Sequence, residues 1–325
     1  NKYGVPLSLF NLNRDHDYGV FEVGMDKRGE IDSLSKIIKP DIGIITNISY
    51  AHAKNFQNIK QIAIAKSEII NNINKDGFVV LNADDKFFYF HKKIANKKKL
   101  NILSFGMKKK ADVKLVKIKK YKKKFKIFLS IHGRKKYFNI SNNFKNFIQN
   151  LLGAIAVVSI YKNPIDLNEN IFYKFQTPDG RGDITKIKLR KKIINLIDES
   201  YNSNPLSLKS AIENFSSIKT KGKKFMILGE MLELGKHSKK LHKKLVPIIN
   251  SSKIDKVNVF GKKMKETFKN IKSIKKGKIL NKTSEINNLI NTNLNNNDYL
   301  MIKGSNSTGL NKFTKELKLG NLNAL

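Results

Sequence analysis

The sequence has no cysteine and no tryptophan, and only six prolines among its 325 residues. Without cysteine, disulfide bonds, thiolate zinc sites and cysteine nucleophiles are all excluded. There is no run of about 18 apolar residues, so no membrane span is expected. The first residues also lack the apolar stretch of a signal peptide. Together these absences favour a protein of the reducing cytoplasm.

Acidic residues are scarce, with 26 Asp and Glu against 64 Lys and Arg, which gives a net charge of +38. The excess is almost entirely lysine. Proteins that read nucleic acids use arginine for bidentate contacts and aromatic rings for stacking. Here lysine, asparagine and isoleucine are abundant in every region, as a compositional bias of the genome would produce. We therefore expect no specific nucleic-acid partner, although a degenerate basic nucleic-acid-binding module stays open as an alternative.

Short apolar runs alternate with helical patterns in the first part of the chain. Strands are expected at 18–23, 41–46 and 78–81, and helices from about residue 30, at 59–73 and at 84–95. This repetition is typical of an α/β fold, with a mostly parallel sheet and helices on both faces. Between residues 113 and 140 the pattern changes to strict alternation, which predicts a small antiparallel section with a turn at His132 and Gly133. A helix is expected at 146–161.

Turn-forming residues at 177–182 mark a domain boundary, so we expect one domain at 1–180 and another at 181–325. In the second domain, strands are expected at 193–197, 225–228, 257–260 and 299–303, and helices at 205–215 and 238–249. This pattern predicts a smaller, Rossmann-like domain.

Polar residues follow each expected strand of the first domain. Glu22 ends the first strand, the motif T-N-I-x-x-A-H at 46–52 follows the second, and L-N-A-D-D at 81–85 follows the third. A further motif, A-K-x-E-I, lies at 65–69 inside a helix. Each motif alone also fits ordinary surface or capping residues. Because the carboxyl ends of parallel strands share the edge where such sheets bind ligands, the group together predicts a site for ATP and Mg²⁺.

The second domain contains D-x-S-Y-N-x-N-P at 198–205, L-G-x-M-L-E-L-G at 228–235 and K-G-S at 303–305. The first motif also fits an Asx-type turn and helix cap, with Pro205 at the first helical position. The second fits an amphipathic turn equally well. From the residues alone, both interpretations of each motif stay open.

These motifs, together with E-x-G-x-x-x-x-G-E-I at 22–31, occur in the order found in the Mur ligase family and resemble its MurF type over nearly the whole chain. The resemblance implies a central ATPase domain of the P-loop type followed by a Rossmann-like C-terminal domain. It implies a cytoplasmic, monomeric ATP-dependent ligase. Its partners would be UDP-N-acetylmuramoyl-tripeptide and D-alanyl-D-alanine, joined through an acyl phosphate during synthesis of the peptidoglycan precursor.

The resemblance also implies roles for individual residues. Glu22 and His52 match ligands of Mg²⁺, and Lys66 matches a lysine that becomes a further ligand once it is carbamylated. Five more residues match positions that contact the nucleotide or the incoming dipeptide, namely Asn150, Arg181, Asp198, Tyr201 and Asn202.

The sequence also departs from the family pattern. It contains no G-x-x-x-x-G-K-[ST] loop to hold phosphates, so we expect a central domain truncated at its N-terminus, a missing UDP-binding domain and no ligase activity from this chain by itself. The family segment G-x-H-N-x-x-N keeps only Asn150, and Asn306 replaces the arginine of K-G-S-R-S. Another amide ligase of the same superfamily, such as MurE or folylpolyglutamate synthase, is an alternative that M-L-E-L-G at 231–235 disfavours.

Overall fold

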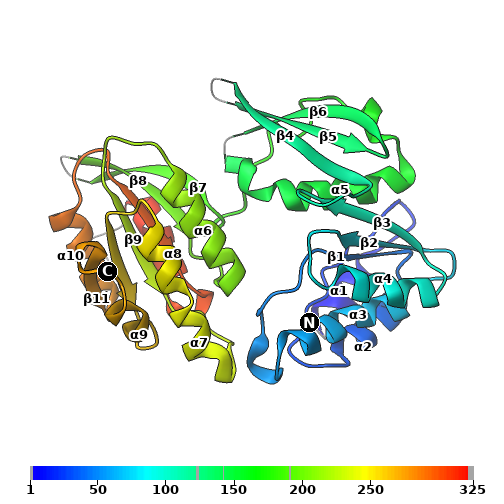
Figure 1. Ribbon diagram of the computed structural model, residues 1–325, viewed down its shortest axis with the longest axis horizontal. Coiled ribbons are helices and arrows are strands. Elements are labelled where there is room, and N and C mark those ends of the chain that lie inside the picture. Colours follow the sequence, from blue (N-terminus) through cyan, green and yellow to red (C-terminus); the bar gives the residue numbers. More distant parts are fainter. Residues whose placement is uncertain (1–2, 122–123, 142, 190–191, 321–325) are drawn as a thin grey trace. The chain divides into compact units, whose positions relative to one another are not determined.

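The computed structural model describes residues 3–121, 124–141, 143–189 and 192–320. Its contacts divide the chain into two compact units. The first comprises Asn1–Ile48 and Asn55–Phe175, and the second comprises Ser49–Lys54 and Gln176–Leu325. Within the described residues, each unit is built around one six-stranded sheet (Figure 1).

The sheet of the first unit follows the chain, in the order β1-β2-β3-β4-β5-β6. Its strands are β1 Ile42–Ile45, β2 Phe78–Asn82, β3 Asn101–Gly106, β4 Val113–Tyr121, β5 Lys124–Ile131 and β6 Arg134–Ser141. The first four are parallel, whereas β4, β5 and β6 pair antiparallel. The predicted mostly parallel sheet with an antiparallel section is confirmed, and His132 and Gly133 form the turn between β5 and β6 with positive φ values of 47° and 82°.

Five α-helices of the first unit are described: α1 Gly4–Phe10, α2 Glu30–Ile38, α3 Ile59–Asn71, α4 Phe88–Lys97 and α5 Ile148–Tyr161. Two neighbouring residues of β1 show which faces of the sheet are covered by α3 and α5. A Cβ on Gly43 would meet Ile69 of α3 and Ile73, which follows this helix. The Ile44 side chain instead lies against Gly153 of α5. Because successive residues of a strand point to opposite faces, α3 and α5 cover opposite sides of the sheet (Figure 1).

The strand expected at residues 18–23 is wrong. This segment has irregular backbone, and Tyr18 and Val20 are 58% and 95% exposed. An apolar run becomes a strand only where a neighbouring edge takes up its backbone hydrogen bonds. In the described residues the sheet begins at β1, and the segment pairs with no strand.

Helix α5 lies in the main core of the first unit. Its buried side chains Leu151, Leu152 and Ile155 pack with Phe105 of β3 and Ile127 of β5. By length and composition alone, the stretch Phe144–Tyr161 is apolar enough to cross a membrane. A helix that packs against a sheet in a protein core has the same composition.

The second unit has the strand order β11-β10-β9-β12-β8-β7. Its strands are β7 Asp183–Leu189, β8 Lys192–Glu199, β9 Lys224–Gly229, β10 Lys256–Phe260, β11 Lys276–Leu280 and β12 Tyr299–Lys303. All pairs are parallel except β7 with β8, which makes β7 an antiparallel edge. The expected Rossmann-like sheet is present, although the sequence patterns did not predict β7 or β11.

The helices of the second unit lie on its two sheet faces. They are α6 Pro205–Ser217, α7 Ser238–Lys243, α8 Leu245–Ser251, α9 Met264–Lys269, α10 Thr283–Asn293 and α11 Leu310–Leu319. Phe225 and Ile227 of β9 pack in one core with side chains of α10 and α11. The single helix expected at 238–249 is divided into α7 and α8.

Candidate functional site

The predicted site residues are divided between the two units. Glu22, Lys66 and Asn150 belong to the first unit. The second unit contains His52, Arg181, Asp198, Tyr201 and Asn202.

Lys66 is the most perturbed site residue of the first unit. It lies on α3, and burial lowers the pKa of its amine, while the Glu22 carboxylate partly opposes this by favouring the charged form. The structure thus brings Glu22 close enough to act electrostatically on Lys66. Glu22 itself is exposed and lies on an irregular segment rather than at a strand end.

The backbone that follows Glu22 is fixed by two glutamates. Glu68, two residues after Lys66, accepts hydrogen bonds from the backbone nitrogens of Gly29 (2.9 Å) and Asp32 (3.1 Å). Glu30 accepts one from the nitrogen of Asp26 at 2.6 Å. Because Gly29 and Asp32 are at the N-terminus of α2, Glu68 also complements the helix dipole there. The A-K-x-E motif therefore joins α3 to the loop that carries Glu22.

The two aspartates of L-N-A-D-D hold backbone groups at the edge of the sheet. Asp84 accepts hydrogen bonds from the nitrogens of Met107 (2.6 Å) and Lys109 (2.8 Å), just after β3. Asp85 accepts one from the nitrogen of Ile48 at 2.7 Å, just after β1. The motif thus connects the loops that follow three neighbouring strands, a structural role that the sequence patterns did not reveal.

His52 and Asn150 have different surroundings. His52 lies in the short segment 49–54, which belongs by its contacts to the second unit, and its Nδ1 is 2.6 Å from Glu233 Oε2. Glu233 is part of the M-L-E-L-G motif. Asn150 is exposed in the first turn of α5. Among the described residues, no group of three or more His, Asp or Glu side chains is placed to hold a metal ion.

In the second unit, Arg181 and Tyr201 form one cluster. The Arg181 guanidinium lies 4.4 Å from the centre of the Tyr201 ring, a cation–π contact. Gly180 has a positive φ of 72°, and a Cβ there would lie 3.0 Å from Tyr201 N, so this position favours glycine. Both Arg181 and Tyr201 are exposed, and they present a planar cation and an aromatic ring to the surface.

Asp198 lies in β8, and the loop that follows this strand contains Tyr201 and Asn202 and leads into α6. Asn204 accepts hydrogen bonds from the nitrogens of Leu206 (3.1 Å) and Ser207 (2.9 Å), and Pro205 is the first helical residue. The helix cap, one of the two interpretations left open for this motif, is present. Asp198 is 1% exposed, whereas Asn202 is exposed.

The M-L-E-L-G loop after β9 is held by a buried histidine and a serine. His242 of α7 accepts a hydrogen bond from Met231 N at 3.1 Å through Nε2, and burial lowers the pKa of His242. Ser305 Oγ accepts one from Leu232 N at 2.9 Å. The M-L-E-L-G and K-G-S motifs are therefore in direct contact.

Two functional features were not predicted from the sequence. Glu68 was part of a motif but had no role, and Lys318, whose Nζ lies 2.7 Å from Asp198 Oδ2, was not singled out at all. In a chain with so many lysines, one near the end of an amphipathic helix gives no signal of its own. Only its position against the buried Asp198 distinguishes it.

Two family models match the chain in sequence. The Mur ligase middle domain matches residues 1–158, and the Mur ligase, glutamate ligase domain matches residues 184–306. The chain is similar to UDP-N-acetylmuramoyl-tripeptide–D-alanyl-D-alanine ligases. It is 31% identical to the Rickettsia prowazekii ligase over 96% of this chain and 69% of the relative. It is 34% identical to the ligase of Buchnera aphidicola from Acyrthosiphon pisum, over 98% of this chain and 68% of the relative.

Solved structures show the same relationship. A crystal structure of MurF from Acinetobacter baumannii superposes with a TM-score of 0.84 and 26% identity, covering 97% of this chain and 68% of that one. MurF from Thermotoga maritima, solved in complex with ADP, has a TM-score of 0.81 at 24% identity and shares the fold. The chain thus spans about two thirds of the length of these relatives. The matches to both family models, and to relatives along nearly all of its length, show that this chain belongs to the Mur ligase family and is of the MurF type.

Proposed function

We propose that this chain takes part in ATP-dependent ligation, in which D-alanyl-D-alanine is joined to UDP-N-acetylmuramoyl-tripeptide during synthesis of the peptidoglycan precursor. The observation that carries the proposal is the similarity to ligases of that name along nearly the whole chain. Each of the two units contributes residues that match the family's motifs.

The chemistry follows from the two substrates. The terminal carboxylate of the tripeptide attacks the γ-phosphorus of ATP, giving an acyl phosphate and ADP. The free amine of the dipeptide then attacks the acyl carbon, the bond from carbon to the bridging oxygen breaks, and phosphate leaves with that oxygen. Positioning and charge neutralisation are the protein's main tasks in such a reaction.

We assign each of Glu22, His52 and Lys66 the role of a Mg²⁺ ligand, because each matches a metal-binding position of the family's motifs. A lysine ammonium repels a cation, but the carbamate formed from a neutral amine and CO₂ supplies carboxylate-like oxygen ligands, which Mg²⁺ prefers. The buried environment fits this assignment, because it lowers the pKa of Lys66 and so favours the neutral amine that reacts. When bound, the ion would neutralise charge on the phosphates.

We assign Asn150, Arg181, Tyr201 and Asn202 to contacts with ATP or the dipeptide. The exposed Arg181 and Tyr201 support this, since a guanidinium and an aromatic ring suit a phosphate and a planar base respectively. Asp198 is different, because both of its carboxylate oxygens are bonded inside the protein. We therefore assign it to holding the loop rather than to touching substrate.

The test is phosphate release from ATP by the complete gene product, with the tripeptide precursor and with or without D-alanyl-D-alanine. Release should require the dipeptide, and D-glutamate or diaminopimelate should not replace it. Lys66→Ala and Glu22→Ala should each lower kcat/KM by about 100-fold or more, as expected for groups that stabilise charge in the transition state. Lys60→Ala, at an exposed position of the same helix, is the matched control and should retain activity. Release that does not depend on the dipeptide would refute the proposal.

A further inference from the structure

A buried carboxylate lies near the end of β8, just before the loop that leads to α6. Asp198, the penultimate residue of β8, is 1% exposed. Its Oδ1 accepts hydrogen bonds from the Ser200 nitrogen at 3.0 Å and the Ser200 hydroxyl at 2.5 Å. A buried carboxylate loses most of its hydration, so its charge is stable only beside a cation or a full set of donors.

Lys318 of α11 supplies that cation. Its Nζ lies 2.7 Å from Asp198 Oδ2 and 2.7 Å from Asp183 Oδ2. Burial disfavours the ammonium, but the hydrogen bonds to Asp183 and Asp198 outweigh it and raise the pKa of Lys318. One turn earlier on α11, the Thr314 hydroxyl is 2.8 Å from the Ser200 hydroxyl. Helix α11 thus fixes the first residues of the loop.

A second lysine fixes the rest of the loop. Lys303 at the end of β12 is 2% exposed, and its Nζ lies 3.1 Å from Glu199 Oε2 and 3.1 Å from the carbonyl oxygen of Asn202. The Ser305 hydroxyl lies 3.4 Å from the carbonyl oxygen of Ser203. The backbone of residues 198–203 is therefore anchored by buried groups, while the Tyr201 and Asn202 side chains remain exposed.

We propose that Lys318 is a positioning residue for the ligation reaction: by pairing with buried Asp198, it sets the loop that presents Tyr201 and Asn202. This inference rests on the proposed function, which assigns those two side chains to substrate. Lys318 acts through Asp198 and touches no substrate itself. When a buried supporting contact is removed, the side chains that it positions are held less firmly in the geometry that the reaction needs.

The test compares Lys318→Met and Lys318→Arg with Lys315→Met, whose lysine is exposed on the same helix. In the complete gene product, at a temperature where circular dichroism shows every variant folded, Lys318→Met should lower kcat/KM for dipeptide-dependent phosphate release by about 10- to 100-fold. Lys318→Arg, which keeps the cation, should recover most of this loss. The control should stay within about twofold of the wild type. Should Lys318→Met fail to fold, Lys318→Gln, which keeps a donor without the charge, takes its place.

A second measurement does not depend on activity. Amide hydrogen exchange of peptides that cover residues 198–204 should be faster in Lys318→Met than in the wild type and unchanged in Lys315→Met. Unchanged exchange, or an unchanged kcat/KM in a folded Lys318→Met protein, would overturn the inference. If the wild-type protein shows no dipeptide-dependent release, the proposed function fails instead, and the exchange data still decide whether Lys318 anchors the loop.

Discussion

At the scale of single residues, Lys66 differs from the other lysines whose pKa burial lowers. Lys192, Lys224 and Lys275 also have a pKa lowered mainly by burial, and each donates to main-chain carbonyl oxygens. A carboxylate also favours the charged form of these three lysines, Asp298 for Lys192 and Asp255 for the other two, as Glu22 does for Lys66. Lys66 differs because, among the described residues, its amine donates no hydrogen bond to a main-chain oxygen. An amine whose pKa is lowered by burial and that makes no structural hydrogen bond fits a chemical site.

We predict that Lys66 reacts with CO₂ to form a carbamate. In ¹³C-bicarbonate the protein should show a carbamate ¹³C resonance, because burial lowers the pKa of Lys66 and so favours the neutral amine that reacts. The resonance should be absent from Lys66→Ala and present in Lys60→Ala. A wild-type spectrum identical to that of Lys66→Ala would contradict the assignment of Lys66 as a metal ligand.

At the scale of helices and strands, periodicity predicted the buried elements best. Helix α3 and strands β1, β2, β8 and β12 were predicted within a few residues, because their apolar residues follow the helical or strand period closely. Local patterns do not predict β7, because it is an edge strand in which lysines alternate with apolar residues. They wrongly predict a strand at 18–23, because its apolar run resembles that of a buried strand. In both cases, whether the segment forms a strand depends on a neighbouring strand that can pair with it, and the local sequence does not show that neighbour.

The candidate site likewise contains residues that the sequence identified and contacts that it did not. The resemblance to the Mur ligase motifs singled out Arg181, Tyr201 and Asn202, and all three side chains are exposed. The contacts that hold them join residues far apart in sequence, such as Lys318 with Asp198 and Glu68 with Gly29. Those contacts depend on how strands and helices pack, so they became visible only in the fold.

Two buried histidines connect elements in a way that depends on pH. His242 of α7 accepts a hydrogen bond from Met231 after β9, and His91 of α4 lies 3.1 Å from the Ala63 carbonyl oxygen of α3. Burial lowers the pKa of both histidines in the folded state. The unfolded chain therefore binds more protons below the ordinary histidine pKa of about 6.5, and stability is lost as the pH falls below that value.

We predict that the free energy of unfolding, measured by urea titration, is nearly constant from about pH 8 to 7. It should then fall by about 1 kcal/mol per histidine for each further pH unit below about 6.5. His242→Gln should make this fall shallower, whereas substitution of the exposed His16 should not. A wild-type stability that stays flat down to pH 5 would show that neither histidine is held neutral by the fold.

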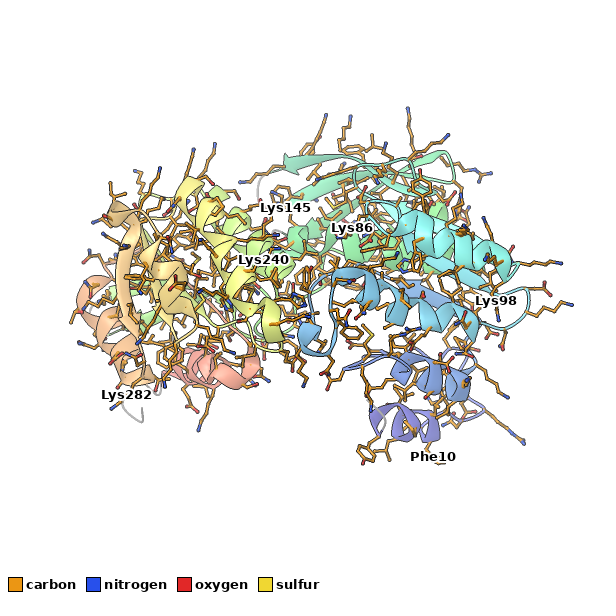
Figure 2. All side chains as sticks on the ribbon, turned by 60° about the horizontal axis from the view of Figure 1, so that its bottom comes forward. Phe10, Lys86, Lys98, Lys145, Lys240 and Lys282 are labelled. Atoms are coloured by element: carbon orange, nitrogen blue, oxygen red, sulfur yellow. The ribbon has the colours of Figure 1, made fainter. Side chains whose placement is uncertain are left out.

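At the scale of the whole molecule, the charge of +38 is carried by side chains that surround both units. Three of the lysines that Figure 2 labels, Lys86, Lys98 and Lys282, are exposed. The buried Lys303 and the partly buried Lys318 are paired with carboxylates inside the second unit. The excess charge is thus a property of the surface, where it attracts anionic substrates over a distance set by the salt concentration.

The most direct test of ligation through an acyl phosphate follows one oxygen atom. The complete gene product is given ATP, D-alanyl-D-alanine and UDP-N-acetylmuramoyl-tripeptide whose terminal carboxylate carries ¹⁸O at both oxygens, and the released phosphate is examined by mass spectrometry. We expect one ¹⁸O atom in each phosphate released, and no release when the dipeptide is left out. Unlabelled phosphate, or release without the dipeptide, would contradict ligation through an acyl phosphate.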